Sequence, residues 1–98
     1  MTEKQGIKEI MRRAADIKPT VHVGKEGLSE AIALELKDQI KRNKVVKVRV
    51  LSSSALGASE VAEQLAQSTD SVLVDVRGSN AVFCERREYR NLSQKKNL

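Results

Sequence analysis

Apolar residues recur along the chain with two periods, and the longer period predicts three helices. Between residues 28 and 42 an apolar residue falls at every fourth position, which is typical of an amphipathic helix with one buried stripe. Similar stripes predict helices over 4–16 and 56–68. Pro19 disfavours helical backbone at the residue before it, so the first helix is expected to end near residue 16.

The shorter period, an alternation of apolar and polar residues, predicts strands. The clearest strand is 45–51, in which valines on one face alternate with Lys47 and Arg49 on the other. The remaining strands are predicted over 20–23, 71–77 and 80–86. A short turn containing a glycine joins the last two as a hairpin. The predicted order is therefore helix, strand, helix, strand, helix, strand, strand.

This order predicts an α/β fold with a four-stranded mixed sheet. Strand–helix–strand connections favour parallel neighbours, and the final hairpin adds an antiparallel pair. Each helix has a single apolar stripe, and strand 45–51 has one aliphatic face and one charged face. We therefore expect all three helices to lie on one face of the sheet and the other face to stay open.

The length of 98 residues is enough for one domain, which we assign to residues 1–90. Residues 87–98 are polar and basic without any period, so we expect a frayed C-terminal end, with a disordered tail over 91–98. Only 2% of the residues are aromatic, so the core must be built from aliphatic side chains.

Composition indicates the class of binding partner and the cellular compartment of the protein. The net charge of +5 and a sequence pI near 9.6 favour a polyanionic partner. No apolar run is long enough to span a membrane, and the N-terminus lacks a secretory signal. Cys84 is the only cysteine and is expected to be a buried strand residue, which fits a reducing, cytoplasmic location. With one histidine besides, it cannot form a structural zinc site, and no cofactor is expected.

The segment Gly24-Lys25-Glu26-Gly27, here called the GxxG loop, lies between a predicted strand and a predicted helix. Its glycines permit a tight turn and leave the backbone amides uncovered, near the positive end of the helix. Lys25 adds a mobile positive charge, and KH modules clamp RNA with a Gly-x-x-Gly loop. From these four residues alone, an ordinary strand-to-helix turn with a solvated lysine is the simpler interpretation.

Further motifs in the same order and spacing point to a family. They are Ile17-Lys18-Pro19, the run from Val23 to Glu30, Glu35, the strand Val46-Lys47-Val48-Arg49, and Val76-Arg77-Gly78. With these residues the chain resembles the YhbY-like proteins, the stand-alone form of the CRM domain (chloroplast RNA splicing and ribosome maturation). The resemblance covers nearly the whole chain. It implies a fold like the C-terminal domain of translation initiation factor three, and RNA binding without catalysis. For stand-alone bacterial members it implies association with precursors of the large ribosomal subunit.

The chain departs from the family pattern after the hairpin glycine. There the family tends to have an aliphatic stretch ending in Tyr-Arg, where this chain has Cys84-Glu85 followed by Arg86-Arg87. The departure weakens the expectation of an RNA contact at the end of the last strand. It does not affect the contact expected at the GxxG loop.

Ten residues are candidates for contact with RNA. They are Gly24, Lys25, Glu26 and Gly27 in the loop, Arg12, Arg13 and Lys18 before the first strand, Lys47 and Arg49 on one strand face, and Arg86. Lys25 with the loop amides is the first choice. The basic residues outside the loop have an alternative role, which is to keep a helix or sheet face soluble. Because aromatic residues are scarce, we expect no stacking platform, and recognition of backbone and shape that weakens strongly with salt.

The sequence therefore predicts a monomeric, non-catalytic protein that binds ribosomal RNA or a pre-ribosomal particle, without a membrane or small-molecule partner. No catalytic residue is expected, because Ser52, Ser53 and Ser54 have no neighbouring base and His22 is an alternating strand residue. The alternatives are an Alba-like chromatin protein that coats DNA as a dimer, a small nuclease, and a protein-docking adaptor. A nuclease would need a cluster of metal-binding carboxylates, which the scattered acids do not form.

Overall fold

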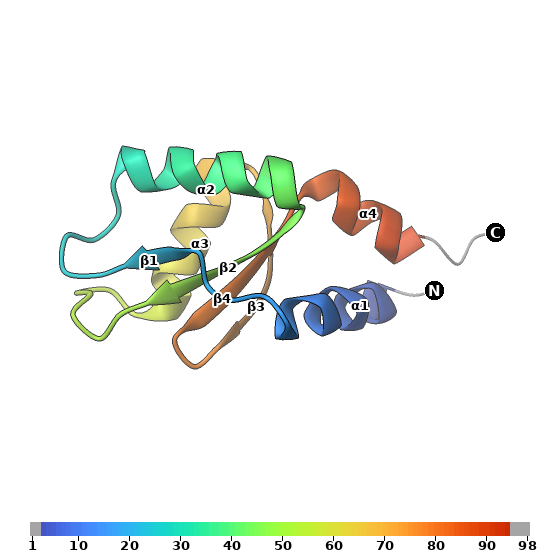
Figure 1. Cartoon of the computed structure of the whole chain (residues 1–98), viewed down its shortest axis with the longest axis horizontal. Helices are drawn as coiled ribbons and strands as arrows, with labels where there is room; N and C mark the ends of the chain where they lie inside the picture. Colours follow the sequence, from blue (N-terminus) through green and yellow to red (C-terminus); the bar gives the residue numbers. More distant parts are fainter. Residues whose placement is uncertain (1–2, 95–98) are drawn as a thin grey trace.

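The computed structural model describes residues 3–94 and contains four helices around one sheet (Figure 1). In chain order the elements are α1 (Glu3–Ala15), β1 (Val21–Val23), α2 (Glu30–Asn43), β2 (Val45–Val50), α3 (Ala58–Thr69), β3 (Val72–Arg77), β4 (Asn80–Cys84) and α4 (Arg86–Gln94). The first seven elements follow the predicted order, with boundaries that differ by at most two residues. Within this described part, no helix is both long enough and apolar enough to cross a bilayer.

The four strands form one mixed sheet in the order β1-β2-β4-β3. β1 pairs with β2 in parallel, whereas β4 is antiparallel to both of its neighbours, β2 and β3. The predicted four-stranded mixed sheet is therefore confirmed. The hairpin inserts its second strand, β4, into the middle of the sheet and leaves β3 at the edge.

The first face of the sheet packs against α2 and α3, and it is apolar along its whole length. It presents Val46, Val48 and Val50 from β2 and Ala81 and Phe83 from β4, each at most 5% exposed. To the same core, α2 contributes Leu36 and Ile40, and α3 contributes Val61 and Leu65. Burial of this aliphatic surface is the main source of stability, and Phe83 lies at its centre with no exposed area.

The second face packs against α1 and α4, so the expectation of three helices on one face is wrong. Ile10 and Ala14 of α1 and Leu92 of α4 form a separate buried cluster with Val45, Val82 and Cys84. The reason is visible in β4, where the run Ala81-Val82-Phe83-Cys84 is apolar at every position. A strand of this kind is buried on both faces, and it therefore needs cover on both.

Strand β3 contains a bulge that overturns its expected alternation. Leu73 pairs with Phe83 and Asp75 pairs with Val82, so Val74 is an extra residue without a partner. Because of the extra residue, each later side chain of β3 points to the face opposite to the one that strict alternation predicts. Leu73 and Val76 consequently share the first face, whereas Asp75 lies on the second face.

Helix α4 replaces most of the expected frayed end. It runs from Arg86 to Gln94, and Leu92 is only 6% exposed in the second-face cluster, where Tyr89 also packs. The prediction of a tail is therefore wrong for residues 87–94, and residues 95–98 lie outside the described part. Helices α1 and α4 lie side by side and extend beyond the sheet at the same end (Figure 1).

Candidate nucleic-acid interface

The GxxG loop forms a closed turn directly after β1. The backbone N–H of Gly27 donates a hydrogen bond of 2.9 Å to the carbonyl oxygen of Gly24. Gly27 has a φ of 72°, in the left-handed region that favours glycine. Lys25 and Glu26 are exposed at the tip. Their own amide groups donate to no acceptor within residues 3–94, so two N–H groups beside Lys25 are available to an anion.

Gly24 is favoured for a different reason, which is close packing against the loop that follows β2. A Cβ atom at this position would lie 3.2 Å from Cδ1 of Leu51 and 3.2 Å from Oγ of Ser53. The two loops therefore pack closely, and a side chain at residue 24 would force Leu51 or Ser53 to move. Both glycines have structural roles in the turn, and either substitution would disturb the loop as well as any ligand.

The helix after the loop begins later than predicted. Ser29 is the N-cap of α2, and its hydroxyl oxygen accepts a hydrogen bond of 3.2 Å from the backbone N–H of Ile32. Leu28 belongs to the connection and packs its side chain against the first-face core. The N-terminus of α2 is thus separated from the GxxG turn by two residues.

Three loops meet at the same end of the sheet, opposite the projecting ends of α1 and α4 (Figure 1). They are the GxxG loop, the loop after β2, and the β3–β4 hairpin turn. Hydrogen bonds of 2.7 Å tie them together, from Leu51 N–H to the carbonyl of Val23 and from Val50 N–H to the carbonyl of Ser79. We call this the loop end of the molecule.

At the loop end, the last row of the sheet is polar across all four strands. The pairing places His22 beside Arg49, Arg49 beside Asn80, and Asn80 beside Arg77. Cross-strand partners point to the same side of a sheet, and here it is the second face, since Asn80 is two residues from Val82. We call these four residues the terminal row. Three of its members, His22, Arg77 and Asn80, were not among the candidates from the sequence.

The next row brings Lys47 onto the same face, because Lys47 pairs with Val82. Lys18 lies in the segment alongside, since the backbone N–H of Thr20 donates to the carbonyl oxygen of Lys47 at 3.1 Å. Among the described residues, Lys18, Lys25, Lys47 and Arg49 form no ion pair. Their charges are therefore not neutralised within the described part of the chain.

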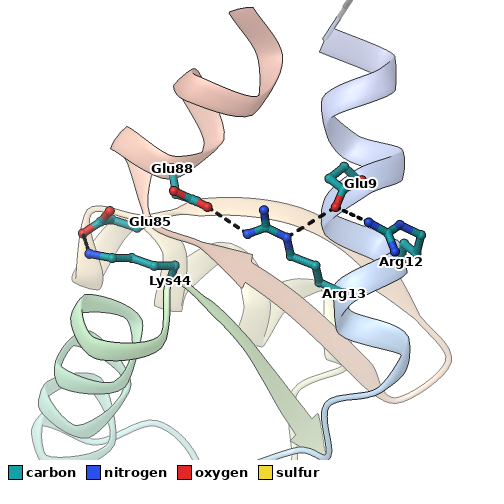
Figure 2. Close-up of polar contacts among 6 residues, drawn as sticks. All are labelled: Glu9, Arg12, Arg13, Lys44, Glu85 and Glu88. Atoms are coloured by element: carbon teal, nitrogen blue, oxygen red, sulfur yellow. Dashed lines mark hydrogen bonds and ion pairs between the residues drawn. The ribbon is translucent and has the colours of Figure 1, made fainter. Parts of the chain in front are cut away.

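The other basic candidates are already paired. Arg12 bonds Glu9 at 2.5 Å, and Arg13 reaches both Glu9 at 3.5 Å and Glu88 of α4 at 2.8 Å (Figure 2). The hydrogen bond from Arg12 lowers the pKa of the Glu9 carboxyl, and the bond to Glu88 raises the pKa of the Arg13 guanidinium. Arg13 thus joins α1 to α4, which gives it a structural role besides the one predicted.

Arg86 begins α4 and pairs with Asp70 at 3.0 Å. The neighbouring residue, Glu85, pairs with Lys44 at 3.0 Å and also donates its backbone N–H to the carbonyl of Lys44 at 2.8 Å (Figure 2). Lys44 ends α2 with a φ of 70°, so these contacts hold a residue in an uncommon backbone conformation. The charged residues at this junction therefore connect the ends of α2 and α3 to the start of α4.

Groups that could bind a metal do not gather in the part of the chain that the structure describes. No three side chains of the His, Cys, Asp or Glu type come together as a possible metal site there. Cys84 is buried, as expected from its strand, and burial raises the pKa of its thiol to about 12. A thiol in this state is a poor nucleophile.

The sheet with helices on both faces, and a basic half of one face that is only partly covered, places the chain among small α/β proteins with a polar surface on the sheet. The profile of the CRS1/YhbY (CRM) domain matches residues 1–84, and the chain belongs to this family. The chain is also similar to a hypothetical protein of Staphylococcus aureus whose solution structure is described as that of a "putative RNA binding protein". The two are 31% identical over 88% of each chain, with a TM-score of 0.71. A search of curated proteins finds no match.

Proposed function

We propose that the protein binds RNA without catalysis, and that RNA contacts the loop end. The observation that carries the proposal is the grouping of unpaired charges: Lys25, Lys47 and Arg49 lie toward one end of the sheet, next to two free loop amides. Membership of the CRM family and the description of the Staphylococcus aureus neighbour support RNA as the polyanion.

In this proposal the loop and the sheet face contact the sugar-phosphate backbone together. The free N–H groups of Lys25 and Glu26 donate to phosphate oxygens, and the Lys25 ammonium adds a point charge. Lys47 and Arg49, two residues apart on β2, then follow the strand of RNA across the second face. Three neutralised phosphates would give a slope of log affinity against log salt of about −2.

We further propose that the RNA is ribosomal, in a precursor of the large subunit, and that the protein acts in the cytoplasm as a monomer. The resemblance to stand-alone bacterial CRM proteins supports this choice. Sedimentation of a cell lysate tests it, because the protein should travel with large-subunit particles and return to the top of the gradient after ribonuclease treatment. If the protein remains with another protein after ribonuclease treatment, it is an adaptor instead.

The loop contact is tested by Lys25→Glu. We expect this variant to lose about tenfold in affinity for structured RNA, since it removes one attraction and adds a repulsion. The salt slope should become shallower by about 0.7 to 1. The free energy of unfolding should change by less than about 0.5 kcal/mol, because Lys25 is exposed and has no partner among the described residues.

The matched control is Lys41→Glu, an exposed lysine near the end of α2 that lies away from the loop end. It makes the same change in net charge and should leave the salt slope unaltered. Equal losses of affinity in the two folded variants would contradict the loop assignment and indicate diffuse electrostatic attraction. Duplex DNA as competitor separates the proposal from the Alba-like alternative, which requires DNA to compete as well as RNA does.

A further inference from the structure

Asn80 occupies the middle of the terminal row and has an unsatisfied buried acceptor. Its Oδ1 atom is buried, and no donor within residues 3–94 is in hydrogen-bonding range of it. Buried side-chain amides in folded proteins almost always have a partner, so an unpartnered one calls for an explanation. Here the neighbours across the strands are Arg49 and Arg77, whose long side chains point to the same face.

The Asn80 side chain lines a cavity of about 220 Å³ between α1 and the sheet. The helix contributes the apolar walls, Met11, Ala14 and Ala15, and the sheet contributes Val82 with the cations Lys47 and Arg77. The site thus combines apolar walls, one amide and positive charges at its rim. Flat heteroaromatic groups that carry a phosphate match all three features.

We infer that this cavity takes an unpaired base of single-stranded RNA, with the Asn80 amide hydrogen-bonded to the edge of the base. The inference rests on the proposed function and adds a base contact to it. An amide offers an acceptor and a donor side by side, as base edges do, and asparagine commonly pairs with bases in this way. Rotation of the terminal amide about its soft χ2 torsion turns the oxygen toward the cavity.

The flanking groups fit the rest of such a nucleotide. Lys47 and Arg49 reach the phosphates on either side, and the Arg77 guanidinium offers a plane on which a base can stack. Arg77 is held by Asp75 at 2.9 Å, which limits its freedom before a ligand arrives. A protein with few aromatic residues can therefore hold an unstacked base without an aromatic platform.

The test compares a single strand of about ten nucleotides with the same strand lacking every base, measured by fluorescence anisotropy. The bare strand keeps all phosphates, so it isolates the base contribution. Wild-type protein should bind the complete strand more tightly by about tenfold. Asn80→Ala should lose about three- to tenfold on the complete strand and nothing on the bare strand.

The melting temperature provides a second measurement. It would fall on substitution if Asn80 had only a structural role. Removing an unsatisfied buried acceptor costs no hydrogen bond, so the melting temperature of Asn80→Ala should stay equal or rise. The matched control is Asn91→Ala on the exposed side of α4, which should change neither binding nor the preference for bases. Asn80→Val, a residue favoured in strands, carries the same expectations and serves if the alanine variant folds poorly.

Two results would overturn the base contact while leaving RNA binding intact. One is a wild-type protein that binds the complete and bare strands equally. The other is an Asn80 variant that loses the same factor on both strands. Binding to neither strand at low salt would instead refute the proposed function, so the two failures are distinguishable.

Discussion

The two faces of the sheet are built from the same strands and differ in how far they are covered. On the first face, helices α2 and α3 cover every inward residue of β2 and β4. On the second face, α1 and α4 bury Val45, Val82 and Cys84, and only part of the surface toward the loop end is covered. The rest of this face carries Lys47 and Asn80, which are half-buried beside α1, and Arg49 and Arg77, which are exposed.

Buried apolar area and exposed charge are therefore separated along single strands. In β2 the second face changes from Val45 to Lys47 within two residues, and in β4 from Val82 to Asn80. One half of the face contributes buried apolar area, which stabilises the fold. The other half carries the exposed charges of Arg49 and Arg77, which bury little apolar area and contribute less to folding.

The largest expected effect is at the centre of the first face. Phe83→Ala should destabilise the protein by about 3–5 kcal/mol, because it removes a fully buried ring and leaves a cavity. Chemical denaturation monitored by circular dichroism measures it. At that cost the variant is expected to be largely unfolded, given the usual margin of a small domain.

Arg49→Ala is the counterpart of Phe83→Ala on the other half of the sheet. Its side chain is exposed and has no partner in the described chain, so stability should change by less than about 0.5 kcal/mol. Affinity for RNA should nevertheless fall. A destabilisation near that of Phe83→Ala would show that the open half belongs to the core after all.

Leu92→Ala tests whether α4 is part of the fold. The side chain is 6% exposed in the second-face cluster, so its truncation should cost about 2 kcal/mol. Exposed Arg90→Ala, on the same helix, should be nearly neutral and serves as the control. If both variants have the same denaturation midpoint as the wild type, α4 contributes nothing to stability. The second face is then less covered than described.

The smallest effect is expected for the link between α1 and α4. Arg13 and Glu88 are 40% and 25% exposed, so their ion pair is partly screened by solvent. A double-mutant cycle of Arg13→Ala and Glu88→Ala should give a coupling energy of about 0.5 kcal/mol. Raising the salt concentration should reduce it. A coupling of zero would show that this ion pair does not help to hold the two helices together.

Local patterns predicted the elements well where one face of each was buried and the other solvated. The helical stripe of α2 and the alternation of β2 gave their positions within two residues. The GxxG loop was also found between β1 and α2, because glycine spacing is a local signal. What these patterns did not determine was which side of the sheet each helix covers.

Helix α4 and the β3 bulge were missed because their signals are sparse or non-local. Only Tyr89 and Leu92, three residues apart, mark the buried side of a helix that is otherwise polar and charged. The bulge at Val74 depends on pairing with β4, so alternation within β3 could not reveal it. The unbroken apolar run of β4 was the available hint that both faces are covered.

The grouping of the candidate residues could be predicted only in part, for the same reason. Lys25, Lys47 and Arg49 stand out in sequence because their neighbours are glycines or valines. Asn80 and Arg77 join them only through the register of three strands, one of them inserted between β2 and β3. No spacing in the sequence encodes that adjacency, and it becomes evident once the strand order is known.

The edges of the sheet have a consequence for solubility. Every sheet edge can recruit another strand and thereby start aggregation. One edge here is β1, only three residues long, and the other is β3, which is interrupted at Val74 and carries Asp75 and Arg77. Short length, a bulge and charge all discourage edge-to-edge association. The protein can thus expose half of a sheet face at high concentration without offering its edges to a second copy.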